Sequence, residues 1–146
     1  MQEEKIKELI RRKVIRNRQA DLSKIKSMVE SAKINAEVAK EMKTDEKHAT
    51  TIFREIYESI RQLGDTLWWI NGFEPLNHEV SLEILKEADI KDKIKLNSLD
   101  RFKAIRNDAN YRGYRVSINQ AQEILDFWKN QGKEIMGLIE SKLKSY

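Results

Sequence analysis

Two neighbouring segments of the chain, residues 22–42 and 44–70, carry apolar side chains at steps of three and four residues along their whole length. That spacing is typical of amphipathic α-helices, because it places the apolar residues of each segment on one face. Asp21 is a suitable N-cap for the first helix, and Thr44 or Asp45 for the second. Since so few residues separate them, the two predicted helices form an antiparallel hairpin.

Four further helices are predicted from the same periodicity, at residues 3–12, about 77–87, 96–113, and from 117 almost to the end. Ser117 and Gln120 have the spacing of a capping box, and Gly113 suits the left-handed residue that closes a helix. We find one proline, five glycines and no strand-like alternation. The predicted fold class is therefore all-α, an antiparallel bundle of about five or six helices.

Two details of the helices are less regular. Trp68 and Trp69 are adjacent, so they point about 100° apart on a helix. We expect one ring to enter the core and the other to reach its rim, where it would form a dimer contact. Gly132 should weaken the last helix locally, because glycine in a helix interior is destabilising.

The positive charge is concentrated near the N-terminus. The formal net charge is +4, and residues 1–26 hold nine Lys and Arg against four Asp and Glu, a balance of 9 − 4 = +5. Such a cluster is usually a solvated face, although it also attracts polyanions. We divide the chain into a basic helical extension, residues 1–19, and a helical bundle, residues 20–146.

Several classes of chemistry have no residues to carry them. The chain has no cysteine, and neither of its two histidines, His48 and His78, has a second histidine three or four residues away. Glycine-rich phosphate loops and hydrolase motifs are also absent. We therefore predict no metal and no cofactor. Without a signal-like or membrane-length apolar run, we expect a soluble, cytoplasmic protein that does not enter a membrane.

A polar cluster interrupts the apolar face of the 96–113 helix. Arg106 lies at the edge of a stripe formed by Leu99, Phe102, Ile105 and Ala109. A fixed charge held partly inside is costly unless an anion or several acceptors meet it. Two interpretations stay open. Arg106 is a structural arginine bonded to a neighbouring helix, or it faces a cleft and meets phosphate, together with Asn107, Asn110 and Tyr111.

Three stretches resemble the HEPN domain family: SAKINAEVAKEM, IYESIRQLGDTLWWINGFEPLNHE and RNDANYRGYRVSINQAQEIL. The resemblance covers roughly residues 20–142 and implies a four-helix core preceded here by a short N-terminal helix. In this family an arginine, a following polar residue and a histidine form a metal-independent RNA-cleaving site, usually in the cleft of a symmetric homodimer. Arg106 matches the arginine and Asn107 the polar residue.

The family's histidine has no counterpart in this chain, because its expected positions hold Tyr111, Arg112 and Gly113. The resemblance then implies a homodimeric module that binds RNA or a nucleotide through Arg106, Asn107, Asn110 and Arg112. It also implies a minimal nucleotidyltransferase as partner, in a toxin–antitoxin-like system.

Two alternatives remain. In the first, the protein is a metal-independent endoribonuclease whose catalytic residues are Arg106, Asn107 and Tyr111, with tyrosine in place of histidine. In the second, it is a structural bundle that only interacts with another protein, and Arg106 is purely structural.

Overall fold

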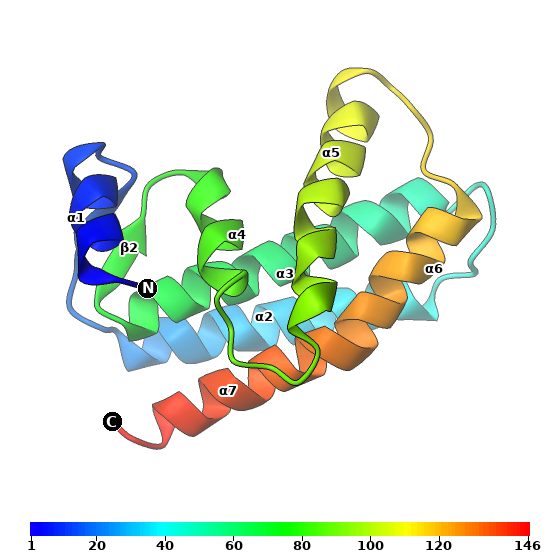
Figure 1. The fold of residues 1–146 in the computed structure, drawn as a ribbon. Coiled ribbons are helices and arrows are strands. Elements are labelled where there is room, and N and C mark those ends of the chain that lie inside the picture. The colour runs from blue at the N-terminus through cyan, green and yellow to red at the C-terminus, as the bar shows by residue number, and fades with distance from the viewer.

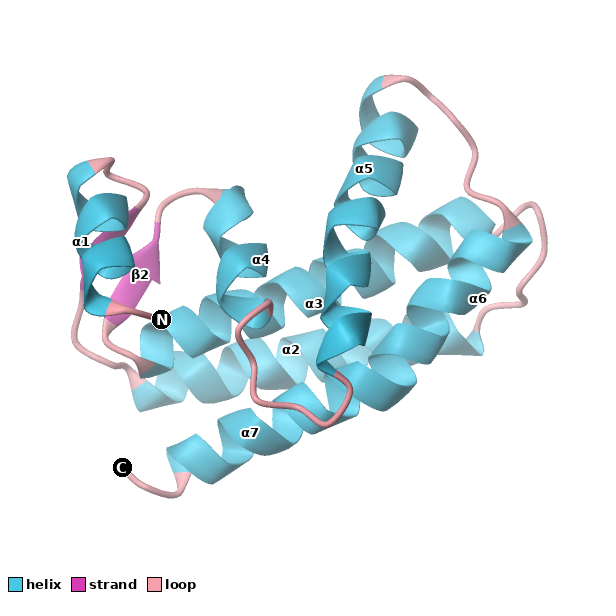
Figure 2. Ribbon diagram, in the orientation of Figure 1, coloured by secondary structure: helices cyan, strands magenta, loops and turns pink.

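The computed structural model describes all 146 residues, and 71% of them are helical. The chain forms an all-α bundle with one very small sheet, as Figures 1 and 2 show, so the predicted fold class is confirmed. The helices are α1 (Glu3–Arg11), α2 (Leu22–Glu41), α3 (Ala49–Ile70), α4 (His78–Leu85), α5 (Ser98–Tyr111), α6 (Ile118–Phe127) and α7 (Lys133–Leu143). A 3₁₀ turn, Lys93–Asn97, leads into α5. None of the helices combines the length and apolar composition that a membrane crossing requires.

Helices α2 and α3 form the predicted antiparallel hairpin, and α3 is the central helix of the bundle, with α2 packed along it (Figure 1). The side chain of Asp21 caps α2 by accepting a hydrogen bond of 3.0 Å from the amide of Lys24. The α3 helix begins at Ala49, later than predicted, because Asp45 forms a turn and accepts from the amide of His48. The two helices approach closely, since the inner face of α2 consists largely of alanine.

The last two helices are continuous through a π turn, Trp128–Gly132. Ser117 and Gln120 form the predicted capping box at the start of α6. The weak point expected at Gly132 coincides with the π turn. A Cβ atom there would lie 3.1 Å from the ring of Trp128, so glycine leaves room for a large buried side chain.

Helices α4 and α5 both lie on the same side of the α2–α3 hairpin (Figure 1). Leu99 and Phe102 anchor α5, and both side chains are buried. The ring of Phe102 meets Phe53 of α3 and Phe127 of α6 edge to face, with centroid separations of 5.9 and 5.4 Å. The first half of α5 is therefore fixed in the core, whereas its second half rises above the bundle (Figure 1).

A two-stranded sheet was not expected from the sequence. Strand β1 (Ile15–Asn17) pairs antiparallel with β2 (Phe73–Pro75), so that Ile15 is opposite Pro75. Each strand has three residues, too few to produce a recognisable alternation. The sheet ties the basic N-terminal segment to the end of α3, and both Leu9 and Ile15 belong to the core that the bundle shares. Part of the basic cluster is also neutralised, because Arg16 pairs with Glu74 at 2.6 Å.

The prediction that one of the two adjacent tryptophans reaches the rim is wrong. Trp68 is 1% exposed and Trp69 is 5% exposed. The indole nitrogen of Trp68 donates to the carbonyl of Val80 at 2.8 Å. Trp69 is covered by Lys24 of α2, whose ammonium lies 4.1 Å from the ring centroid. Neither ring is therefore available as the dimer contact that we expected of the outward tryptophan.

Candidate phosphate-binding site on α3 and α5

Arg106 lies in the middle of α5, and its side chain is half-buried. The carbon of its guanidinium lies 5.6 Å from the centroid of the Tyr57 ring on α3, a cation–π distance. One guanidinium nitrogen donates a 3.2 Å hydrogen bond to the side chain of Asn107. Arg106 forms no ion pair, because no carboxylate oxygen lies within 4.0 Å of it. Most of its five donors are thus free to bind an anion.

A polar network on α3 lies beside this arginine. Arg61 binds Glu58 through two nitrogens, at 2.5 and 3.1 Å, and Asp65 through a third, at 2.7 Å. The three residues are spaced three and four apart, so they share one face of α3. The side chains of Arg61 and Asp65 are only 13% and 14% exposed. In contrast to Arg106, Arg61 is therefore fully engaged within the protein.

Helix α4 completes the network from the other side. The hydroxyl of Ser81 donates a short hydrogen bond to Asp65. His78 is the first residue of α4, and the side chain of Asn77 caps that helix by accepting from the amide of Glu79 at 2.7 Å. Residues of α3 and of the segment that enters α4 line a small pocket of about 260 Å³ there, namely Arg61, Asp65, Pro75, Leu76, Asn77 and His78.

The charges of this region shift the pKa values of two carboxyl groups in opposite directions. Hydrogen bonds from Arg61 lower the pKa of Glu58, and the charges of His78 and Arg106 lower it further. Burial raises the pKa of Asp65, although Ser81 and Arg61 oppose that shift. Since His78 and Arg106 both act on Glu58, the α3 network, the start of α4 and the middle of α5 share one electrostatic environment.

The structure brings together only some of the residues that the sequence analysis selected. Arg106 and Asn107 are in contact, whereas Asn110, Tyr111 and Arg112 lie exposed at the end of α5. Tyr111 is 77% exposed and makes no hydrogen bond through its hydroxyl. Gly113 follows with φ +69°, which confirms the predicted left-handed helix end.

The two histidines have different surroundings. His48 precedes α3 and binds Asp45 at 2.7 Å, nine residues before Tyr57, which is about 14 Å along a helix. His78 is the histidine whose charge reaches the Arg61 network. No three His, Asp or Glu side chains are grouped closely enough to hold a metal ion.

Sequence reasoning missed the network below Arg106. The spacing of Glu58, Arg61 and Asp65 was a usable signal, because charged residues of opposite sign three and four apart pair on a helix. Ser81 gave no such signal, since its partner is 16 residues away and is reached only when α4 packs on α3.

The shifted pKa of Glu58 predicts how stability depends on pH. A carboxyl whose pKa is lower in the folded than in the unfolded state stabilises the fold above its unfolded pKa. That stability is lost as pH falls through the folded pKa. We therefore expect wild type to be more stable than Glu58→Gln near pH 7, and the difference to shrink as pH falls below the ordinary pKa of a glutamate, about 4.3.

The measurement is urea unfolding of both proteins across this pH range. Asp65 has a raised pKa and shifts stability in the opposite direction. Because Asp65 shares Arg61 with Glu58, its contribution is measured separately with Asp65→Asn. A difference that stays constant with pH would show that the Arg61–Glu58 pair does not stabilise the fold through the charge of Glu58.

Comparison with known proteins gives no relative: no family model matches the chain, and neither the curated proteins nor the solved structures include one with significant similarity to it. The resemblance to the HEPN family therefore stays a prediction that rests on three stretches of sequence.

Proposed function

We propose that this protein is a HEPN-like module that binds RNA or a nucleotide, and that Arg106 is its central phosphate contact. The observation that carries the proposal is that Arg106 is half-buried without any carboxylate partner. A buried charge needs an acceptor, and the planar guanidinium matches the oxygens of a phosphate group. The ring of Tyr57 packs against the guanidinium of Arg106. The N–H donors of Arg106 that remain free therefore point in a limited range of directions.

Neighbouring residues extend the same surface. Asn107 is bonded to Arg106 and offers an amide to the same ligand. Arg54 is exposed, forms no ion pair and lies one turn before Glu58, on the same face of α3 as the Arg61 network. Asn110 and Arg112 lie at the exposed end of α5, where Arg112 pairs with Asp108 at 3.8 Å. A ligand with several phosphates, such as RNA, can reach more of these groups than a single phosphate can.

The resemblance supplies two further parts of the proposal. The module acts as a homodimer, and a minimal nucleotidyltransferase is its partner in a toxin–antitoxin-like system. Both parts are carried by the resemblance alone. The exposed end of α5, with Asn110 and Tyr111, is the surface on which we would look for either contact, because it is the part of the Arg106 helix that the rest of the chain leaves uncovered.

Binding of a fluorescent single-stranded RNA, followed by anisotropy at several salt concentrations, tests the proposal. We expect affinity to fall steeply with salt and Arg106→Ala to weaken binding about tenfold, because a charge-assisted hydrogen bond to phosphate is lost. Arg101→Ala is the matched control, since Arg101 is on the same helix but pairs with Glu123 of α6. That variant should change affinity less than about twofold.

Two results would contradict this proposal. Binding that does not depend on salt, or equal affinity of the Arg106→Ala and wild-type proteins, would show that Arg106 does not bind phosphate. If Arg106→Ala instead lowers the melting temperature strongly, Arg106 is structural, as in the protein-interaction alternative.

A metal-independent endoribonuclease is the second candidate, and one observation favours it. His78 lines the small pocket bordered by Arg61 and Asp65, so an imidazole lies beside the α3 network that Arg61 forms with Glu58 and Asp65. Imidazole can accept the proton of a ribose 2′-hydroxyl as that oxygen attacks the adjacent phosphorus. The bond from phosphorus to the 5′-oxygen then breaks, the leaving 5′-oxygen takes the proton from the imidazolium, and a 2′,3′-cyclic phosphate remains, while arginine can stabilise the charge that develops on the phosphoryl oxygens. This role would belong to His78 rather than to Tyr111, which is exposed at the end of α5.

Incubation of the same RNA in the presence of a chelator separates the two candidates. Cleavage that is lost in Arg106→Ala and His78→Ala but kept in His48→Ala would establish the enzyme. Cleavage that is lost in Tyr111→Phe would show that Tyr111, rather than His78, is the catalytic residue. RNA that stays intact with wild type leaves the binding module.

A further inference from the structure

Tyr57 of α3 has a buried ring and a hydroxyl without a partner. The residue is 5% exposed, and its hydroxyl makes no hydrogen bond within the protein. Its oxygen is nevertheless not enclosed in the core, because the enclosed side-chain atoms that lack a partner belong to Ser59, Gln62 and Glu123. Buried tyrosine hydroxyls usually find a hydrogen-bond partner. The hydroxyl of Tyr57 therefore reaches the surface of the protein with its donor unused.

Arginine side chains lie around Tyr57. Arg54 precedes it by three residues and Arg61 follows it by four, so the three side chains share one face of α3. Arg106 packs on the ring from α5, with its guanidinium carbon 5.6 Å from the ring centroid. Burial raises the pKa of the Tyr57 hydroxyl, and the charges of Arg106 and Arg61 oppose that rise. The hydroxyl therefore stays protonated near pH 7 and can donate a hydrogen bond there.

Two of these arginines lack a carboxylate partner. Arg61 is engaged by Glu58 and Asp65, whereas neither Arg54 nor Arg106 has a carboxylate oxygen within 4.0 Å. A guanidinium group only donates hydrogen bonds, so these arginines cannot accept one from the tyrosine hydroxyl. An anion with several oxygens is the kind of ligand that can accept from the hydroxyl and from a free guanidinium at the same time.

We propose that Tyr57 is a second phosphate contact of the RNA-binding site, and that its hydroxyl donates a hydrogen bond to the same phosphate group that Arg106 binds. This inference rests on the function proposed above. A guanidinium and a phenol can donate to different oxygens of one phosphate, so the group is held from two helices, α5 and α3. The ring of Tyr57 then supports Arg106, while its hydroxyl contacts the ligand directly.

Tyr57→Phe tests this contact, because it removes only the hydroxyl and keeps the ring that packs on Arg106. In the RNA anisotropy assay we expect about fivefold weaker binding, since one hydrogen bond to phosphate is lost. The melting temperature should stay unchanged, because the hydroxyl has no partner within the protein that its removal would leave unbonded. A structural role of the hydroxyl would instead lower the melting temperature, and that result would overturn the inference.

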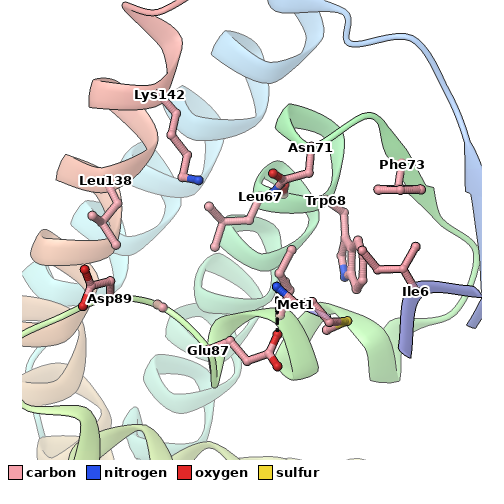
Figure 3. A pocket seen from close by; sticks show the side chains of 12 residues that line it. Met1, Ile6, Leu67, Trp68, Asn71, Phe73, Glu87, Asp89, Leu138 and Lys142 are labelled. Atoms are coloured by element: carbon pink, nitrogen blue, oxygen red, sulfur yellow. Dashed lines mark hydrogen bonds and ion pairs between the residues drawn. The ribbon is translucent and has the colours of Figure 1, made fainter. Parts of the chain in front are cut away.

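Tyr146→Phe is the matched control, because the hydroxyl of Tyr146 donates to the carbonyl of Ile70 at the other end of α3. That end of α3 borders a separate cavity of about 420 Å³, where the side chains of Trp68 and Asn71 likewise donate to carbonyls of the protein (Figure 3). Any effect of Tyr146→Phe should therefore appear in the melting temperature, and the affinity for RNA should equal that of wild type.

A double-mutant cycle shows whether Tyr57 and Arg106 bind the same phosphate. If they do, combining Tyr57→Phe with Arg106→Ala should weaken binding by less than the product of the two single losses. The inference is overturned if the two losses multiply, or if Tyr57→Phe binds RNA as tightly as wild type while Arg106→Ala binds it more weakly. Equal affinity of Arg106→Ala and wild type would instead overturn the proposed function itself.

Discussion

Gly64→Ala is expected to lower the free energy of unfolding by about 3 kcal/mol, because α4 packs directly on this glycine. A Cβ atom at position 64 would lie 2.0 Å from the carbonyl oxygen of Ser81 and 2.7 Å from its carbonyl carbon. These are backbone atoms, so no side-chain rotation can relieve the overlap. Helix α4 would have to move away, and that movement would also disturb the bonds Ser81–Asp65 and Trp68–Val80.

Gly137→Ala is the control for this experiment. Gly137 is exposed in α7, and an added Cβ atom would have no neighbour within 4 Å. Alanine in an open helix position should raise the free energy of unfolding by about 0.5–1 kcal/mol. Urea unfolding of the two variants should therefore give changes of opposite sign. Equal stability of Gly64→Ala and wild type would mean that α4 does not pack as closely on α3 as the structure has it.

The same glycine shows where prediction from the sequence stops. The spacing of apolar residues in the 44–70 segment puts Gly64 on its inner face with Leu63 and Leu67, and the structure buries all three. Periodicity identifies which residues face inward, but not what they face. Whether a small inward residue lies against a side chain or against the backbone of another helix depends on long-range packing.

The sequence predicted helix caps and helix ends correctly where both interacting residues lie within a few positions of each other. The Asp21 cap, the Ser117–Gln120 capping box and the left-handed Gly113 each involve residues at most three apart. The strands β1 and β2 were missed because their pairing joins residues 58 apart, Arg16 and Glu74. The burial of Trp69 was missed for the same reason, since Lys24 covers it from α2.

The sequence likewise indicated only part of the candidate site. Arg106 and Asn107 were selected from their position on one helix and from the family resemblance, and their side chains are in contact in the structure. Arg61 was not selected, although it shares an electrostatic environment with Arg106. A single sequence gives the two arginines equal weight. Only the partners that α3 and α4 provide distinguish an engaged arginine from a free one.

Arg61→Met is expected to lower the free energy of unfolding by about 3 kcal/mol at pH 7, because two carboxylates lose their common cation. Asp65 is the more costly of the two, since its side chain is 14% exposed and burial already raises its pKa. Methionine fills much of the space of the arginine stem, so the expected loss is mainly electrostatic. The loss should shrink at acid pH, where Asp65 takes up a proton and no charge is left unpaired.

Two further variants separate the charge effect from a packing effect. Adding Asp65→Asn to Arg61→Met should recover part of the lost stability at pH 7, because it removes the carboxylate that was left without its cation. If the second substitution destabilises the protein further, the loss comes from packing or from the Ser81 hydrogen bond. Arg101→Met, at a pair whose side chains are 53% and 40% exposed, should cost at most about 1 kcal/mol.

The contrast between Arg61 and Arg106 is what makes Arg106 a functional candidate. Removing Arg61 leaves the mostly covered carboxylate of Asp65 and the more exposed carboxylate of Glu58 without their cation. Removing Arg106 leaves only the side-chain oxygen of Asn107 and the ring of Tyr57 without a partner. We therefore expect the fold to depend more on Arg61 than on Arg106. A half-buried guanidinium loses part of its hydration, and its contacts within the protein offset that free-energy cost only partly. An anionic ligand is the partner that would offset this cost. We therefore expect Arg61→Met to lower the free energy of unfolding and Arg106→Ala to lower the affinity for RNA.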